Sequence, residues 1–154
     1  MSERAPTLQN RKAHHDYFIL ESQEAGIALA GCEVKSIRNG KASLQDSFAR
    51  VEKDEVWLYG MHISPYEQGN RYNLEPTRVR KLLLKRSEIQ NLAHRVQEKG
   101  LSMVPIRLYF KHGKVKIQLA IARGKSVRDK RDKLREKEAN RDIDRALRAR
   151  QKRL

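Results

Sequence analysis

Few residues in this sequence have the types and spacing that a catalytic or metal site requires. His14, His15 and Asp16 are adjacent and carry groups that can bind a metal or transfer a proton. Neighbouring side chains on a helix or a strand point in different directions, however. No second histidine, cysteine or carboxylate cluster has the spacing to complete a coordination shell. We therefore interpret the three as exposed polar residues beside the first strand and expect no metal site.

Other signs of catalysis are also missing from the sequence. Cys32 is the single cysteine, which excludes an intramolecular disulfide. Without a histidine near it in the sequence, it is interpreted as a small core residue. Neither glycine-rich phosphate-binding pattern occurs, GxGxxG or GxxxxGK followed by Ser or Thr. We expect a protein that is not an enzyme and binds no cofactor.

Basic side chains are the more informative chemical groups. Guanidinium and ammonium groups on a rigid sheet neutralise phosphates at fixed positions, and rings in a polar loop can stack on unpaired bases. The basic candidates are Arg11, Lys12, Lys35, Arg38, Lys41, Arg78, Arg80, Lys81 and Lys85. The ring candidates, in or near residues 64–78, are His62, Tyr66 and Tyr72. Together they can bind RNA if the fold gathers them on one side.

The overall charge also favours a nucleic-acid partner. The 154 residues include 34 basic and 19 acidic side chains, a net charge of +15, and 38% are hydrophobic. Such a surplus favours a polyanion, either a nucleic acid or an anionic membrane surface. The first ten residues lack the apolar region of a signal peptide, and no apolar run approaches the roughly 18–20 residues of a membrane span. We expect a soluble, cytoplasmic protein.

The composition changes after Ala122 and divides the chain into two regions. Residues 1–122 carry 20 basic and 13 acidic side chains, whereas residues 123–154 carry 14 basic and 6 acidic ones and no aromatic residue. The second region has too few large apolar residues to offset the entropy of ordering its backbone. It nevertheless lacks proline and contains i,i+4 pairs such as Asp144–Arg148, which favour a helix. We expect a tail that is disordered when free and folds on an RNA surface; the alternative is a solvated tail that only improves solubility.

Residues 1–122 show mainly β patterning. Alternation is clearest in residues 114–121, which we expect to pair across His112–Gly113 with residues 104–110. Pro105 restricts that partner strand to an edge or a bulge. Residues 47–52 and 55–59 flank the short polar connection Lys53–Asp54, which is typical of a hairpin. Further strands are expected at residues 17–21 and 80–85.

One helix is predicted between Ser87 and Gly100. Ser87 and Gln90 have the spacing of a capping box, an apolar stripe at helical spacing follows, and Gly100 ends it. Shorter helical segments are predicted at residues 7–14 and 43–48. Several short strands with one or two helices predict a fold that is mainly β with helices, a small OB-like antiparallel β-barrel with a face for oligonucleotides.

Six short motifs follow one another along the chain. They are NRKAHHDYF (10–18), EAGIAL (24–29), EVKSIRNGKA (33–42), RKLLL (80–84), GKVK (113–116) and DKR (129–131). Each motif alone is unspecific, but the ordered series, which extends to the C-terminus, is specific. Together the motifs resemble the small protein B (SmpB) family, the protein partner of tmRNA in bacterial trans-translation.

The resemblance implies an OB-like barrel with packed helices and a C-terminal tail. It implies binding to the tRNA-like domain of tmRNA, promotion of its alanylation by alanyl-tRNA synthetase, and delivery with elongation factor Tu to a ribosome stalled on an mRNA without a stop codon. In that family the tail enters the empty mRNA channel and becomes helical near the decoding centre of the 16S rRNA. No membrane partner is expected, and the protein is expected to be a monomer.

The resemblance also implies roles for particular residues. By position, the family's tmRNA-binding residues fall on Asn10, Glu24 and Leu83. Asn10 can bond phosphate or base edges, Leu83 can contact an exposed base or ribose, and Glu24 can accept from a base N–H or orient a neighbouring cation. On electrostatic grounds we add Arg11, Lys12, Lys35, Lys41 and Lys81. The decoding-centre role falls on Gly124, Lys125, Arg128, Asp129, Lys130 and Arg131.

Two positions depart from the family's usual sequence. Gly-Lys-Lys is replaced by Gly124-Lys125-Ser126, which removes one positive charge, and the usual His or Tyr before Asp-Lys-Arg is Arg128. A guanidinium plane can also stack on a base, so the stacking role can pass to Arg128.

Two other functions fit the composition. One is a ribosomal or ribosome-assembly protein that binds rRNA permanently, which would be retained on all translating ribosomes. The other is a nuclease with dispersed active-site residues, which would turn over RNA as a pure protein with a metal ion.

Overall fold

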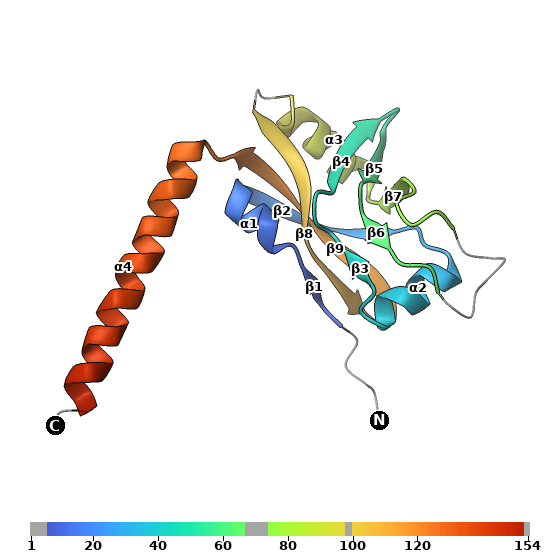
Figure 1. The fold of residues 1–154 in the computed structure, drawn as a ribbon. Coiled ribbons are helices and arrows are strands. Elements are labelled where there is room, and N and C mark those ends of the chain that lie inside the picture. The colour runs from blue at the N-terminus through green and yellow to red at the C-terminus, as the bar shows by residue number, and fades with distance from the viewer. Residues whose placement is uncertain (1–5, 67–73, 98–99, 153–154) are drawn as a thin grey trace. The chain divides into compact units, whose positions relative to one another are not determined.

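Strands from residues 8 to 124 form an antiparallel sheet that closes on itself (Figure 1). The computed structural model describes residues 6–66, 74–97 and 100–152, with the backbone alone of residues 127–130, 132–133 and 151–152. Its strands are β1 (Leu8–Gln9), β2 (Tyr17–Ile27), β3 (Ala42–Ser43), β4 (Phe48–Glu52), β5 (Glu55–Tyr59), β6 (His62–Ile63), β7 (Arg80–Leu83), β8 (Leu101–Lys111) and β9 (Lys114–Gly124). Its helices are α1 (Arg11–Asp16), α2 (Gly31–Arg38), α3 (Arg86–Arg95) and α4 (Val127–Lys152).

The strand order shows how the barrel closes. The order is β1-β8-β4-β5-β7-β2-β9, and β9 pairs again with β8. The ring β8-β4-β5-β7-β2-β9 therefore has no free edge, which protects the sheet from pairing with other chains. The strands β3 and β6 form a separate short ladder. A mainly β fold with an antiparallel barrel and helices is thus confirmed.

The hairpin of β8 and β9 follows the predicted alternation. Val115, Ile117, Leu119 and Ile121 are buried in the barrel core. The register of the two strands shifts between Pro105 and Arg107. Of the edge or bulge expected at Pro105, the structure thus shows the irregularity and not an edge, because β8 has partners on both sides. A second small core contains Ala13 of α1, Val104 and Ile106 of β8, and Ala120 and Ala122 of β9.

The hairpin of β4 and β5 is also confirmed. Its connection, Lys53–Asp54, has positive φ at both residues, 49° and 61°, as the two central residues of a type I′ turn require. The register pairs Phe48 with Tyr59 and Val51 with Val56. The hairpin therefore turns Val56 and Leu58 into the core, where both are completely buried.

The helix α3 begins earlier than predicted and also ends earlier, at Arg95 with Val96 as its C-cap, so the predicted end at Gly100 is wrong. Its N-cap is Lys85, whose backbone N–H donates to the Glu88 carboxylate over 2.8 Å. Ser87 lies inside the first turn, so the predicted Ser87–Gln90 capping box is wrong. A carboxylate interacts more strongly than an amide with the positive end of the helix dipole, which favours Glu88. The predicted apolar stripe is confirmed, since Leu92 is buried in the core and Ile89 packs against it.

Other short segments differ from the sequence expectations. Residues 43–48 are not helical: β3 ends at Ser43 and β4 begins at Phe48. Residues 7–14 contain β1 and the start of α1 instead of a helical turn alone. The helix α2, beside β6, was not predicted. It buries Glu33, Ser36 and Ile37, so its stability depends on tertiary contacts that its local sequence does not reveal.

Residues 125–154 form a second compact unit, separate from residues 1–124. Within it, α4 exposes its described side chains, including the apolar ones, Leu134, Ile143 and Leu147. The helical form expected for the tail is present, and its disorder in the free chain stays a prediction. Among the described residues, no helix is both long and apolar enough to cross a bilayer.

Candidate nucleic-acid interface

Strand β7 separates the predicted basic residues into buried and outward-facing ones. Its side chains alternate, so that Arg80 and Leu82 point into the barrel while Lys81 and Leu83 point out. Arg80 is completely buried, whereas Leu83 is 52% exposed. Arg80 therefore cannot neutralise a phosphate, and its place among the predicted RNA-binding cations is wrong.

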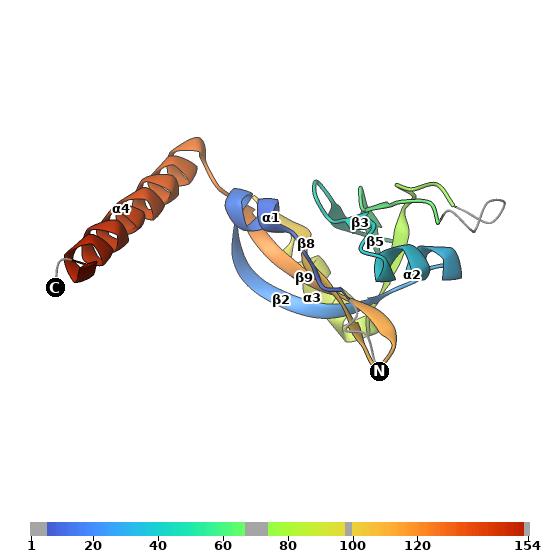
Figure 2. The same ribbon diagram turned by 60° about the horizontal axis from the view of Figure 1, so that its bottom comes forward.

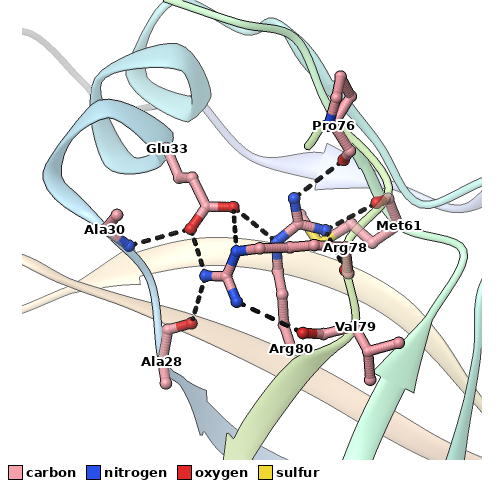
Figure 3. Close-up of polar contacts among 8 residues, drawn as sticks. All are labelled: Ala28, Ala30, Glu33, Met61, Pro76, Arg78, Val79 and Arg80. Carbon is pink, nitrogen blue, oxygen red and sulfur yellow. Dashed lines mark hydrogen bonds and ion pairs between the residues drawn. The ribbon is translucent and has the colours of Figure 1, made fainter. Parts of the chain in front are cut away.

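The buried Arg80 belongs to an ion network with Glu33 of α2 and with Arg78 (Figure 3). Its Nε donates to Glu33 Oε2 over 2.8 Å, and its terminal nitrogens donate to the carbonyl oxygens of Met61 and Pro76 over 2.7 and 2.9 Å. Arg78 donates to both oxygens of the same carboxylate. The network thus fixes α2 and the segment before β7 against the barrel.

Glu33 keeps its charge in spite of its burial. Burial alone would raise the pKa of this carboxyl, but hydrogen bonds from Arg78, from the Ala30 backbone and from Arg80 outweigh it. The pKa of Glu33 therefore lies below its ordinary value. The role of the network is structural, because it holds α2 in place. It thereby leaves Lys35 and Arg38 on the exposed side of that helix.

Strands β2 and β7 bring Glu24 and Leu83 together. Gly26 pairs with Leu83 in the register of these strands, and Glu24 lies two residues from Gly26 on the same outer face. A Cβ atom on Gly26 would lie 3.1 Å from the Cβ of Leu83, so only a glycine leaves the leucine its present position. A carboxylate and an exposed apolar side chain thus lie near each other on the same outer face.

Tyr109 and Lys111 of β8 hold the Glu24 carboxylate. The Tyr109 hydroxyl donates a hydrogen bond to Oε2, and Lys111 Nζ lies 3.4 Å from Oε1. The bond from Tyr109 is the main cause that keeps the pKa of Glu24 below its ordinary value; desolvation opposes it, and Lys111 and Lys116 add to it. An ionised Glu24 acts only as a hydrogen-bond acceptor.

Cations of the β8–β9 hairpin surround this pair. The Arg107 guanidinium lies 4.7 Å from the centre of the Tyr109 ring. On β9, Lys116 pairs with Tyr109 on one side and with Gly26 on the other. We call these residues the hairpin face: Glu24, Leu83, Arg107, Tyr109, Lys111 and Lys116. Sequence reasoning missed Arg107, Tyr109, Lys111 and Lys116, although alternation places Lys116 outside the barrel.

Asn10 lies elsewhere and serves the fold. It is 4% exposed, and its side-chain oxygen accepts from the Ala13 N–H over 3.2 Å at the start of α1. Its amide nitrogen donates to the carbonyl oxygens of Leu44 and Pro105 over 3.1 and 2.8 Å. This differs from the direct phosphate or base contact expected for Asn10, because burial and helix capping use its polar atoms.

The other basic candidates do not form one patch. Lys12 Nζ lies 2.6 Å from Asp46, and Lys81 Nζ lies 3.0 Å from Glu55. Lys35 Nζ lies 5.5 Å from the centre of the Tyr66 ring. Figures 1 and 2 show α1 and α2, which carry Lys12 and Lys35, at different ends of the barrel. Arg11 and Lys41 are exposed, and Tyr72 lies outside the described residues.

The tail candidates follow the barrel along the chain. Gly124 ends β9, and Lys125 lies between β9 and α4. Arg131 is exposed. The backbone of Arg128, Asp129 and Lys130 belongs to α4, and their side chains lie outside the described part of the structure.

The histidines near the N-terminus do not build a metal centre. His15 Nδ1 lies 2.9 Å from Asp16 Oδ1 at the end of α1. Over residues 6–66, 74–97 and 100–152, no three side chains of histidine, cysteine, aspartate or glutamate gather as metal ligands. Cys32 is half-buried on α2.

Comparisons with known proteins give consistent results. The profile of the family described as "SmpB protein" matches residues 7–149. The SsrA-binding protein of Desulforudis audaxviator is 59% identical over 140 residues, which cover 91% of this chain and 92% of that protein. The SsrA-binding protein of Geobacillus kaustophilus is 58% identical over 144 residues, covering 94% and 93%. A solved chain described under "tmRNA-SmpB: a journey to the center of the bacterial ribosome" aligns with a TM-score of 0.69 and 51% identity, covering 80% of this chain and 87% of that one.

Proposed function

The chain belongs to the SmpB family, and on that premise we propose that it is an RNA-binding adaptor of trans-translation, not an enzyme. It binds the tRNA-like domain of tmRNA and promotes its alanylation. With elongation factor Tu, it delivers tmRNA to ribosomes stalled on an mRNA that lacks a stop codon. These steps of trans-translation take place in the cytoplasm. Relatives named as SsrA-binding proteins support the proposal.

The observation that carries the proposal is the hairpin face. Three cations, Arg107, Lys111 and Lys116, can hold phosphates, and the exposed Leu83 can contact a base or ribose. Glu24 is the informative member, because a carboxylate in a site for phosphate alone would only repel the ligand. It favours binding when an unpaired base offers it an N–H group.

Residues outside the hairpin face have supporting roles in this proposal. Asn10 caps α1 and so positions Arg11 and Lys12, whose charges attract phosphates at longer range. Lys35, Lys41 and Lys81 add to the positive field in the same way. Leu83 and Glu24 supply contacts that depend on the RNA, and the lysines supply affinity for any RNA.

The tail supplies the contact with the ribosome. We propose that residues 1–122 bind tmRNA and that residues 123–154 enter the empty mRNA channel. There Gly124, Lys125, Asp129, Lys130 and Arg131 approach the decoding centre, and Arg128 stacks on a ribosomal base. The net charge of this segment, 14 basic against 6 acidic residues, suits a channel lined by rRNA.

The proposal is tested by identifying the RNA that the protein retains in cells. We expect sequencing of the RNA captured with the intact protein to return tmRNA as the main species, and Glu24→Ala to reduce its share. We also expect the protein to be enriched on stalled ribosomes. Equal retention on all translating ribosomes, with rRNA as the main species, would instead indicate a structural ribosomal protein.

A further inference from the structure

The hydrogen bond between Tyr109 and Glu24 crosses a whole strand. Tyr109 lies on β8 and Glu24 on β2, and β9 runs between them. On β9, Lys116 is the partner of Tyr109 and Gln118 is the partner of Glu24. The phenol therefore reaches diagonally over the outer surface of β9 to the carboxylate, and the contact joins residues 85 positions apart.

The tyrosine ring is itself held in place. Arg107 lies over it at 4.7 Å, and the ring is half-buried. A ring fixed by a cation–π contact and by packing loses little further entropy when its hydroxyl makes a hydrogen bond. Tyr109 is thus a rigid support, whereas Glu24 is a flexible side chain on an exposed strand.

We propose that Tyr109 is a positioning residue for RNA recognition, which fixes the Glu24 carboxylate as an acceptor for the N–H edge of an unpaired nucleotide base. This inference rests on the proposed function, because it assumes that the hairpin face binds RNA. The cations beside the pair, Arg107, Lys111 and Lys116, hold the phosphates that flank this nucleotide.

The need for such a support follows from the neighbouring lysines. Lys111 Nζ already lies 3.4 Å from Glu24 Oε1, and Lys116 attracts the same carboxylate. Without the hydroxyl, Glu24 is free to turn fully toward a lysine and form an ordinary surface ion pair. Its oxygens would then be less available to a base. The Tyr109 bond uses one lone pair of Oε2 and leaves others open, since a carboxylate offers about four acceptor sites.

The chain contains a matched control pair on another part of the barrel. The Tyr59 hydroxyl donates to Glu52 Oε1 over 2.5 Å, and both residues are outside the hairpin face. In the closed sheet, β5 lies two strands from β2 and two strands from β8. Tyr59→Phe therefore removes the same kind of bond, from tyrosine to glutamate, without touching the hairpin face.

The test compares the full-length wild type, Tyr109→Phe and Tyr59→Phe in titrations with tmRNA and with a tRNA of unrelated sequence. We expect Tyr109→Phe to weaken tmRNA binding about three- to tenfold, with a smaller effect on the unrelated RNA and an unchanged salt dependence. Lys116→Gln should weaken the binding of both RNAs to the same extent and reduce the slope of log K against log salt concentration by about 0.7–0.9. Tyr59→Phe should bind as the wild type does.

A double-mutant cycle shows whether Tyr109 acts through Glu24. If it does, Tyr109→Phe combined with Glu24→Gln binds no more weakly than Glu24→Gln alone. Additive losses, or wild-type binding by Tyr109→Phe, would overturn the inference. Failure of the wild type to prefer tmRNA over the unrelated RNA would instead overturn the proposed function.

The pH dependence gives a second readout, which a merely structural tyrosine would not change. Tyr109, Lys111 and Lys116 are the groups that favour the ionised form of Glu24. Removing the hydroxyl brings the carboxyl closer to its ordinary pKa, so Tyr109→Phe should lose tmRNA affinity at a higher pH on acidification than the wild type does. Coincident pH profiles would overturn the inference.

Discussion

Glu33 is the anion shared by two arginines, one of which is completely buried. Replacing it with alanine leaves the Arg80 charge buried without its counter-ion, and breaking a buried pair from one side costs about 3–5 kcal/mol. We expect Glu33→Ala to lower the free energy of unfolding by this amount in urea denaturation. Glu55→Ala, which removes the exposed partner of Lys81, should cost less than about 1 kcal/mol. Equal losses of unfolding free energy in the two variants would show that the buried network stabilises the fold no more than an exposed ion pair does.

Acid should remove the contribution of Glu33. Its pKa in the folded protein lies below the ordinary value of 4.5. Its stabilisation is therefore complete above that value and is lost as the pH falls through the lower, folded-state pKa. We expect the difference in unfolding free energy between the wild type and Glu33→Ala to be constant from neutral pH to about pH 5 and to narrow below it. A difference that grows on acidification would be incompatible with this role.

Gly26→Ala tests the close approach of β2 and β7. The new Cβ lies 3.1 Å from the Leu83 Cβ, so the leucine has to move. We expect a loss of about 1 kcal/mol in thermal denaturation together with weaker tmRNA binding. At Gly31 an added Cβ meets nothing within 4 Å, so Gly31→Ala should lower neither the stability nor the tmRNA affinity. If Gly26→Ala and Gly31→Ala have the same thermal stability and tmRNA affinity, the contact with Leu83 is not the reason why position 26 requires glycine.

Residue types and motifs located part of the candidate site. The ordered motifs identified Glu24 and Leu83, which the fold brings together. They did not identify Tyr109, because its contact with Glu24 depends on two strand registers and on the size of the bulge between Pro105 and Arg107. A proline predicts a bulge, but it does not predict how the following side chains align with a strand 85 positions away.

At the scale of elements, local sequence patterns predicted those strands and turns that local interactions determine. The alternation of β9 and the turn of the β4–β5 hairpin arise from residues that are neighbours in the sequence, and both are confirmed. The helix α2 was missed because it buries the negative charge of Glu33. That charge is stabilised by Arg78 and Arg80, which lie more than forty residues further along the chain. The start of α3 was misplaced by two residues, because Ser87 and Gln90 match the sequence pattern of a capping box, whereas Lys85, the actual N-cap, does not.

The helix α4 should be only marginally stable in the free protein. Its described side chains are exposed, Leu134, Ile143 and Leu147 among them, so little burial offsets the entropy of ordering it. We expect hydrogen exchange of the free protein to show fast exchange in residues 127–152 and strong protection in β8 and β9. Protection of α4 should appear on ribosomes. Slow exchange in the free protein would contradict the expectation of a tail that folds on contact.

At the scale of the whole molecule, the charge is divided between two units, and we propose a different task for each. Residues 1–124 carry 21 basic and 13 acidic side chains, a net charge of +8, and residues 125–154 carry 13 basic and 6 acidic ones, a net charge of +7. The barrel spreads its charge over a folded surface with Glu24 among the cations, which suits recognition of one RNA. The tail concentrates its charge on one exposed helix, which suits a channel of rRNA.

A chain that ends after Gly124 tests this division most directly, because it keeps β9 complete and removes only the second unit. After a thermal melt has shown that the barrel is folded, tmRNA affinity and peptide tagging on stalled ribosomes are measured beside the full-length protein. The account predicts that tmRNA affinity stays within about threefold, since the hairpin face is intact, and that tagging is lost. Equal loss of both activities, or tagging at the full-length level, would contradict it.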